Sequence, residues 1–507
     1  MASMPKAESD MPVRRVAIIG GGTAGWMSAA GLVGILGDSV EVTLIESAAI
    51  GTIGVGEATL PHIRFFNQRL GIDENELMAA TGATYKLGIE FRDWGRIGDS
   101  YIHPFGDFGF PINRVGFHHY LARARAQGSD PHLDAFSLPV MAARKNRFQP
   151  PHPDPDNVLS TFGYAYQFDA GLYAKFLRGW CEARGASRIE GRVVDVLQDA
   201  ESGHVTSVRL QDGRTMEADF FIDCSGFRGL LIEQALGTGY KDWTNYLPCD
   251  AAVTAACDPV GPLRPYTTAT ARRSGWTWRI PLQHRVGNGY VYSSRFEDDD
   301  AARDVLLGAL ESPAKTEPRT LRFTTGQRKK SWVGNVVAVG LSGGFLEPLE
   351  STGIYLIQEA ITTLIEMFPQ NGWDAAEPAE YNRIMDEQFE RVRDFLLLHY
   401  VATERDDSPF WRHMRGLDLP GSLAEKMALF TRSGRVTSYE VGAFKDASWL
   451  AVYLGQGVWP AGYDPVADHL SDAELRAEID RARGVIDRAT DGMSAHERYI
   501  DAHCKAA

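Results

Sequence analysis

The sequence predicts an α/β protein whose leading unit is a Rossmann-like dinucleotide-binding fold on a parallel sheet. Three observations support this. Residues 16–19 are a short apolar run rich in β-branched side chains, the composition of a strand buried on both faces. A glycine-rich turn at 20–25 follows, and then a helix-prone segment over 26–36. A second apolar strand at 40–45 ends at Glu46. This is the order of elements that a nucleotide-binding unit requires.

The glycines of this turn stand at the G-x-G-x-x-G positions. The first permits a tight turn, the second lets the backbone approach a pyrophosphate, and the third lets the helix pack on the strand. The carboxylate that ends the second strand is expected to hold a ribose hydroxyl. An αβ turn that needs glycine only for its geometry is the alternative. The residues expected to contact the nucleotide here are Gly20, Gly22, Thr23, Ala24, Gly25 and Glu46.

Composition limits the classes of partner. The 507 residues carry 52 Lys and Arg against 66 Asp and Glu, a net charge of −14, which disfavours nucleic acid and anionic membranes as partners. No apolar run is long enough to span a bilayer, and the five cysteines are odd in number without C-x-x-C spacing. We therefore expect a cytoplasmic protein with reduced, buried thiols. We expect no metal site, because the histidine clusters lack the spacing of metal ligands.

Two further buried strands are expected to rejoin the parallel sheet. Residues 220–226 end in a small-residue turn, and residues 336–341 lead into a helix predicted over 354–368. The backbone N–H groups of Thr352 and Gly353 at that helix start form a candidate anion site. Glu350 lies beside them, either as an acid of the site or only as a partner of the helix dipole.

The segments between these strands are ambiguous when read locally. A strap with alternating glycines, 50–61, could lie against a flat ligand or form a surface loop. Lys86 lies in an expected strand over 83–91, where a lysine is usually a snorkelling edge residue. Aromatic and histidine clusters at 101–106 and 117–120, read as loops, could stack on a planar substrate or fill a core. Trp276 and Trp278 share one face of a strand, and an aromatic-packed sheet is the simpler reading.

The remaining elements are read from their periodicity. Residues 192–197, 205–210 and 216–219 alternate like an antiparallel meander, and a helix is expected to begin at 167–169. Prolines at 149–156 exclude regular structure. A core-facing helix is expected over 381–400. The charge-rich amphipathic helix over 471–491 is expected to be a solvated surface helix, with homodimer contacts as the alternative.

Several of these motifs, taken together, resemble the flavin-dependent halogenases of the tryptophan-halogenase type. The resemblance rests on the glycine turn, the strap around Gly56, Lys86, the Trp-x-Trp-x-Ile-Pro segment at 276–281 and the segment 345–353, in the family's order from residue 16 to 411. It implies an FAD-binding core of the glutathione-reductase/hydroxylase type over 12–370, with an antiparallel sheet. Insertions near 95–165 and 245–325 would face the substrate. A largely helical part, 371–507, would pack on this core as a single unit and cover the substrate.

The resemblance also implies a chemistry. Reduced FAD would come from a separate flavin reductase, by diffusion rather than in a stable complex, and chloride or bromide would be the co-substrate. Hypohalous acid would form beside Thr352 and Gly353 and travel through the protein to Lys86, which would hydrogen-bond it or form a haloamine. Glu350 would strengthen the electrophile or take the ring proton. Trp276 and Trp278 would form a barrier on the flavin side. Further flavin contacts would come from Gly56, Glu57, Ala58, Val193 and Leu341.

The substrate is expected to be indole or another electron-rich arene. His103 and Phe105 fall where family members place rings against the indole. Tryptophan-binding members hold the amino-acid end with a tyrosine pair and a glutamate, but residues 429–432 here read Leu-Phe-Thr-Arg. Glu440 and Phe444 are the nearest equivalents of the rest. Without polar partners a buried zwitterion is costly, so free tryptophan is disfavoured. An FAD aromatic hydroxylase and a non-catalytic flavin-binding protein are the alternative functions.

Overall fold

A parallel sheet carries the nucleotide-binding unit. The computed structural model describes residues 12–49, 56–369, 374–437, 439 and 442–506. The strand order of this sheet is β21-β22-β13-β1-β2-β9, and every pair except β21–β22 is parallel. The four strands expected from sequence are therefore confirmed as neighbours. Its members are β1 (Arg15–Ile19), β2 (Glu41–Glu46), β9 (Ser187–Glu190), β13 (Phe220–Asp223), β21 (Trp332–Val333) and β22 (Val336–Ala338).

A seven-stranded, mainly antiparallel sheet forms the second layer. Its order is β19-β15-β18-β17-β16-β5-β6, and only the β5–β16 pair is parallel. The two tryptophans of the Trp-x-Trp segment lie on β17, the central strand of this sheet. The strands are β5 (Gly88–Arg92), β6 (Ser100–Pro104), β15 (Ala251–Cys257), β16 (Thr267–Arg272), β17 (Gly275–Pro281), β18 (Val286–Tyr292) and β19 (Arg319–Arg322).

Smaller sheets connect these layers. The sheet β3-β8-β4 carries the candidate lysine, and the antiparallel meander β10-β11-β12 is confirmed where the alternation predicted it. The strands are β3 (Gly56–Ala58), β4 (Thr84–Lys86), β7 (Arg147–Phe148), β8 (Ala165–Asp169), β10 (Val193–Gln198), β11 (Val205–Leu210), β12 (Thr215–Glu217), β14 (Tyr240–Asp242), β20 (Gly326–Arg328), β23 (Gly344–Phe345) and β24 (Ser494–Ala495).

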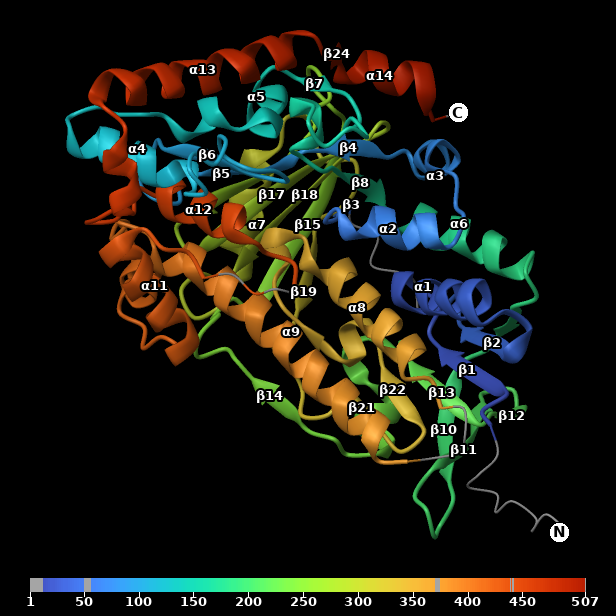
Figure 1. The fold of residues 1–507 in the computed structure, drawn as a ribbon. Coiled ribbons are helices and arrows are strands. Elements are labelled where there is room, and N and C mark those ends of the chain that lie inside the picture. The colour runs from blue at the N-terminus through green and yellow to red at the C-terminus, as the bar shows by residue number, and fades with distance from the viewer. Residues whose placement is uncertain (1–11, 50–55, 370–373, 438, 440–441, 507) are drawn as a thin grey trace, which may run out of the picture.

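Helices cover both sheets. Figure 1 shows α8 and α9 running together beside the parallel sheet, with α13 and α14 along the opposite edge of the molecule. No helix in the described ranges has the length and apolarity needed to cross a membrane. The helices are α1 (Thr23–Gly31), α2 (His62–Arg69), α3 (Glu74–Thr81), α4 (Phe117–Ala126), α5 (Leu138–Arg144), α6 (Ala170–Glu182), α7 (Asp299–Ala309), α8 (Thr352–Glu366), α9 (Ala376–Val401), α10 (Pro409–Arg415), α11 (Gly421–Ser433), α12 (Asp446–Gly455), α13 (Asp472–Asp491) and α14 (His496–His503).

Three local predictions are wrong. The clusters at 101–106 and 117–120, expected as loops, lie largely in β6 and in α4. The single strand expected over 83–91 is two strands, β4 and β5, which belong to different sheets. Residues 167–169 end β8, and the helix begins only at Ala170, with Asp169 as its N-cap. For β6 and β8, strand pairing outweighs local composition, because β6 is fixed by its ladder to β5 and β8 by its ladders to β3 and β4.

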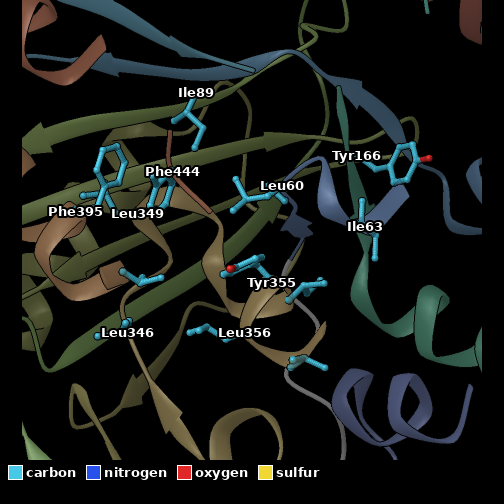
Figure 2. Close-up of a cluster of buried hydrophobic side chains, with 14 of the residues drawn as sticks. Leu60, Ile63, Ile89, Tyr166, Leu346, Leu349, Tyr355, Leu356, Phe395 and Phe444 are labelled. Atoms are coloured by element: carbon cyan, nitrogen blue, oxygen red, sulfur yellow. The ribbon is translucent and has the colours of Figure 1, made fainter. Parts of the chain in front are cut away.

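One large hydrophobic cluster joins the sheets to the helices, from Val13 near the start of the chain to Cys504 near its end. Figure 2 shows part of it, where Phe395 of α9 and Phe444 gather with Leu349 near Ile89 of β5. α13 buries Leu475, Ala482 and Ile486 against other parts of the protein. The division near residue 370 and the dimer alternative stay predictions. All five cysteines are free thiols.

Candidate active site

Lys86 is fully buried at the end of β4, so the snorkelling interpretation is wrong. Its Nζ donates to the Thr59 carbonyl oxygen at 3.1 Å and to Ser351 Oγ at 2.8 Å. The nitrogen also lies 5.2 Å from the centre of the Phe105 ring. Burial lowers the pKa of Lys86 to about 7, although the nearby charge of Glu350 opposes this shift. Both the amine and the ammonium are therefore available near neutral pH.

Glu350 is held between two histidines. It is fully buried, and His103 Nδ1 lies 2.8 Å from its Oε2 and 2.9 Å from its Oε1. On α9, His399 Nε2 lies 2.8 Å from Glu350 Oε1. Burial alone would raise the pKa of this carboxyl, but the charges and hydrogen bonds of the two imidazoles outweigh it and lower the pKa to about 2. Glu350 is therefore an ionised carboxylate at neutral pH.

His399 approaches this carboxylate from α9. Its Nδ1 lies 2.9 Å from the Phe395 carbonyl oxygen, which can only accept, so Nδ1 carries a hydrogen. The other ring nitrogen, Nε2, is the atom that lies 2.8 Å from Glu350 Oε1.

The turn from Glu347 to Thr352 links the lysine to the start of α8. Ser351 has a left-handed backbone, φ 60°, which is uncommon outside glycine and asparagine, and it occupies the N-cap position of α8. Among the described residues, Thr352 Oγ1 is buried without a hydrogen-bond partner, and a Cβ on Gly353 would meet nothing within 4 Å. An orphan hydroxyl, open space and a helix N-terminus together fit an anion such as chloride or bromide.

Trp276 and Trp278 project from one face of β17, with ring centres 6.0 Å apart. The Nε1–H of Trp276 donates to Glu347 Oε2 at 2.9 Å, whereas Nε1 of Trp278 has no partner among the described residues. Trp278 requires glycine at its neighbour on β18, because a Cβ on Gly289 would lie 2.1 Å from the indole ring. Both rings are buried, so they form a rigid aromatic wall.

Phe105, whose ring lies near the tip of Lys86, belongs to a cluster of aromatic side chains. His103 and Phe105 contact each other edge to face at 6.4 Å, and the Phe444 ring lies 6.1 Å from His103. Phe444 stacks on Phe395 of α9 at 3.8 Å. The three predicted substrate-contacting residues are thus brought together beside the lysine and the acid. Glu440 lies outside the described residues.

The glycine turn fits an FAD pyrophosphate. Gly20 has φ 118°, and a Cβ there would lie 2.3 Å from the Cys224 carbonyl oxygen, so only glycine is accommodated. A Cβ on Gly25 would lie 1.8 Å from the Gly20 carbonyl, while Gly22 faces open space at the N-cap of α1. These are the three roles that the motif predicts, and Thr23, which follows Gly22, is the first residue of α1.

The other predicted nucleotide contacts lie around this turn. Glu46 ends β2, where it pairs with Arg188 and receives a hydrogen bond from Trp26 Nε1 at 3.4 Å. The turn containing Leu341 packs on α1, because a Cβ on Gly340 would lie 2.7 Å from Ala24 Cβ. Val193 begins β10 and is half-buried against the core of the parallel sheet.

The strap reaches the tryptophan strand. Gly56, Glu57 and Ala58 form β3, and a Cβ on Gly56 would lie 3.4 Å from Ile280 of β17. Thr59, the next residue, is tied to β8 through Tyr166 and accepts the bond from Lys86. Residues 50–55 lie outside the described part of the chain. No group of three or more His, Cys, Asp or Glu side chains in the described ranges is arranged to hold a metal ion.

Sequence reasoning missed four residues of this site: Thr59, Glu347, Ser351 and His399. Thr59, Glu347 and Ser351 lie inside motifs that were recognised, next to the residues that were selected. His399 gave no local signal, because it lies on a helix read only as core-facing. A buried histidine at that position becomes informative only when the distant acid is placed beside it.

Comparisons with known proteins agree with this geometry. The family model described as tryptophan halogenase matches residues 15–472. Tryptophan 6-halogenase SttH of Streptomyces toxytricini is 36% identical over 508 residues, which cover 93% of this chain and 96% of that protein. A solved flavin-dependent halogenase from Xanthomonas campestris superposes with a TM-score of 0.94 at 46% identity, over 98% of this chain and 99% of that one. BrvH, a flavin-dependent halogenase from Brevundimonas sp. BAL3, gives 0.93 at 42%, over 97% and 99%.

Proposed function

The chain belongs to the tryptophan halogenase family, and we propose that it halogenates indole or a simple indole derivative by way of Lys86. As a member of this family it is a flavin-dependent enzyme that halogenates aromatic substrates. It uses FAD reduced by a separate reductase, with halide as co-substrate. Bound reduced FAD supplies, with oxygen, the two-electron oxidation that converts halide to hypohalous acid. The steps assigned to individual side chains are proposals.

The contacts of Lys86 carry this proposal. Its amine is bonded to Thr59, which directly follows strap strand β3, and to Ser351, which directly precedes Thr352 of the candidate halide site. Its third hydrogen position remains for the oxidant, beside the Phe105 ring. A lysine that joins both cofactor-side elements and faces an aromatic cluster can receive hypohalous acid from one side and present it to an arene on the other.

Either protonation state of Lys86 accounts for the transfer. The ammonium donates a hydrogen bond to the oxygen of hypohalous acid, which makes the halogen more electrophilic. The neutral amine forms a haloamine and releases water. The arene then attacks the halogen, and the ring carbon must lose its proton. Glu350 takes that proton, because even a carboxylate of low pKa is far more basic than a protonated arene.

The segment around 429–432 supports a substrate without the amino-acid end of tryptophan. Phe430 is buried and stacks on Tyr453 at 4.0 Å, and Thr431 bonds to carbonyls of its own helix. Arg432 is exposed. None of these residues offers a buried polar group to a zwitterion, whose unpaired charges would be costly to bury.

The test is a product analysis with indole, bromide, FAD, NADH and a flavin reductase. We expect a monobrominated product whose formation requires bromide. An oxygenated indole formed independently of bromide would instead identify a hydroxylase. Oxidation of reduced flavin without any change in the arene would identify a flavin-binding protein without arene chemistry.

A further inference from the structure

A buried carboxyl group ties the tryptophan wall to the catalytic turn. Glu347 is fully buried, and its Oε2 accepts one hydrogen bond from Trp276 Nε1 at 2.9 Å and another from Tyr400 OH at 2.7 Å. We propose that Glu347 is a positioning residue that fixes the plane of the Trp276 indole, and through it keeps the arene away from the flavin. This inference rests on the barrier role proposed for Trp276.

The bond to Glu347 occupies the only polar atom of the Trp276 side chain. An unpaired indole N–H inside the protein would cost about 1–3 kcal/mol, so the ring is held in the one orientation that satisfies it. The neighbouring ring offers the contrast, since Trp278 Nε1 has no hydrogen-bond partner in the described part of the chain and the ring is held by packing against Gly289. The two rings of the wall are thus fixed by different means.

Glu347 is itself anchored from behind. Tyr400 on α9 supplies the second hydrogen bond, and Cys249 Sγ lies 3.8 Å from the same hydroxyl. Burial raises the pKa of Glu347 to about 7, although the bonds from Trp276 and Tyr400 oppose this shift. The other oxygen, Oε1, has no hydrogen-bond partner among the described residues. Burying a carboxyl group costs free energy when one oxygen accepts two hydrogen bonds and the other accepts none from the described residues. This cost suggests that Glu347 has a role beyond stability.

The same turn positions the acid of the proposed reaction. Glu347 and Glu350 are three residues apart, and the adjacent α9 residues His399 and Tyr400 contact one acid each. A shift of Glu347 would therefore act first on the tryptophan ring, and only through the turn on Glu350. If Glu347 only fastened the turn, its loss would lower the rate of the reaction. It would not divert oxidising equivalents from brominated indole to peroxide or oxygenated indole.

The test compares Glu347→Met, Trp276→Phe and the double variant. The readout is the ratio of brominated indole to reduced FAD oxidised, with hydrogen peroxide and oxygenated indole measured in parallel. Tyr381→Phe removes from α9 a buried hydroxyl that has no hydrogen-bond partner among the described residues, so it is the matched control. Glu347→Gln keeps an accepting oxygen and is the rescue variant.

We expect Glu347→Met to lower the ratio about tenfold, as the loss of one buried hydrogen bond implies, with a matching rise in peroxide or oxygenated indole. The double variant should be no worse than Trp276→Phe alone, because both changes remove the same restraint. Tyr381→Phe should stay within about twofold of the unmodified enzyme, and Glu347→Gln should recover most of the ratio that Glu347→Met loses. An unchanged ratio in Glu347→Met, or a loss that multiplies with that of Trp276→Phe, overturns the inference.

If Glu347→Met does not fold, Glu347→Asp applies the same test, because it keeps the carboxyl group but shortens its reach by one methylene. Its ratio should fall at least about threefold while that of Glu347→Gln does not, and equal ratios would overturn the inference. Absence of brominated product from the unmodified enzyme would contradict the proposed function instead, so the two failures are distinguishable.

Discussion

Lys86 Nζ donates to Ser351 Oγ at 2.8 Å, and this bond joins β4 to the turn that precedes α8. The two residues are 265 positions apart in the chain, so the contact exists only in the folded protein. It ties a buried amine to the residue that directly precedes Thr352, one of the two residues proposed to hold the halide. The predictions below follow from the surroundings of this pair.

Ser351→Gly removes the hydroxyl while relieving the left-handed backbone, which glycine adopts readily. The lysine loses one of its two protein hydrogen bonds, so we expect arene halogenation to fall about tenfold. The relaxed backbone and the lost buried hydrogen bond act in opposite directions, so thermal stability should change little, and oxidation of reduced FAD should continue. Steady-state assays and a thermal melt check this. Unchanged halogenation would show that Ser351 does not position the lysine.

Lys86→Met should stabilise the protein at neutral pH. The unmodified chain must bury an amine whose pKa falls from 10.5 to about 7 on folding. Between these values the unfolded chain binds more protons, so the stability of the unmodified protein rises with pH. Methionine has no such dependence, and it should be more stable by a few kcal/mol at pH 7 and below.

Denaturant unfolding of both proteins between pH 6 and 10, at points about one pH unit apart, checks this. The difference in unfolding free energy should stay constant below pH ~7 and shrink as the pH rises above it. Other titrating groups are common to both proteins and largely cancel in the difference. A difference that is independent of pH would contradict the lowered pKa of Lys86.

His399→Gln should lower the halogenation rate at acidic pH. His399 is one of the two imidazoles that lower the pKa of Glu350 to about 2 against the effect of burial. Without it the pKa of this carboxyl should rise by about 1–2 units, so a higher pH is needed to keep it ionised. The acid limb of the halogenation rate against pH should move upward accordingly.

A pH–rate profile of single-turnover halogenation checks this, with His413→Gln on α10 as the control for loss of a histidine elsewhere. The control should reproduce the acid limb of the unmodified enzyme. If the profile of His399→Gln also coincides with it, His399 does not act on Glu350.

Indole should be a better substrate than free tryptophan. Phe430 packs into the core and Thr431 bonds to its own helix, so the amino and carboxylate groups of tryptophan lack these residues as partners. One unpaired buried charge costs at least about 1–3 kcal/mol, so kcat/KM for indole should be at least about tenfold higher. Competition between the two substrates in one reaction measures this ratio. Preferential halogenation of tryptophan would contradict it.

The nucleotide unit could be predicted from sequence because its signals are local. The apolar runs around Val16 and Val42 and the glycines between them specify strand, turn and helix without distant contacts. The segment around His103 could not be read this way. Its polar and proline residues favour a loop locally, but pairing of His103 with Ile89 makes it a strand. The roles of Lys86 and Glu350 came from family resemblance, whereas their charge states depend on neighbours far away in the chain.

The most direct test of the central claim is the fate of the oxidant in Lys86→Met. With bromide, indole and reduced FAD, this variant should still oxidise bromide, and a hypohalous acid scavenger added to the solution should be brominated. Enzymatic bromination of indole should fall at least about a thousandfold when the scavenger is present. The reason is that methionine can neither donate a hydrogen bond to hypohalous acid nor form a haloamine. Bromination of indole at the unmodified rate under these conditions would contradict transfer through Lys86.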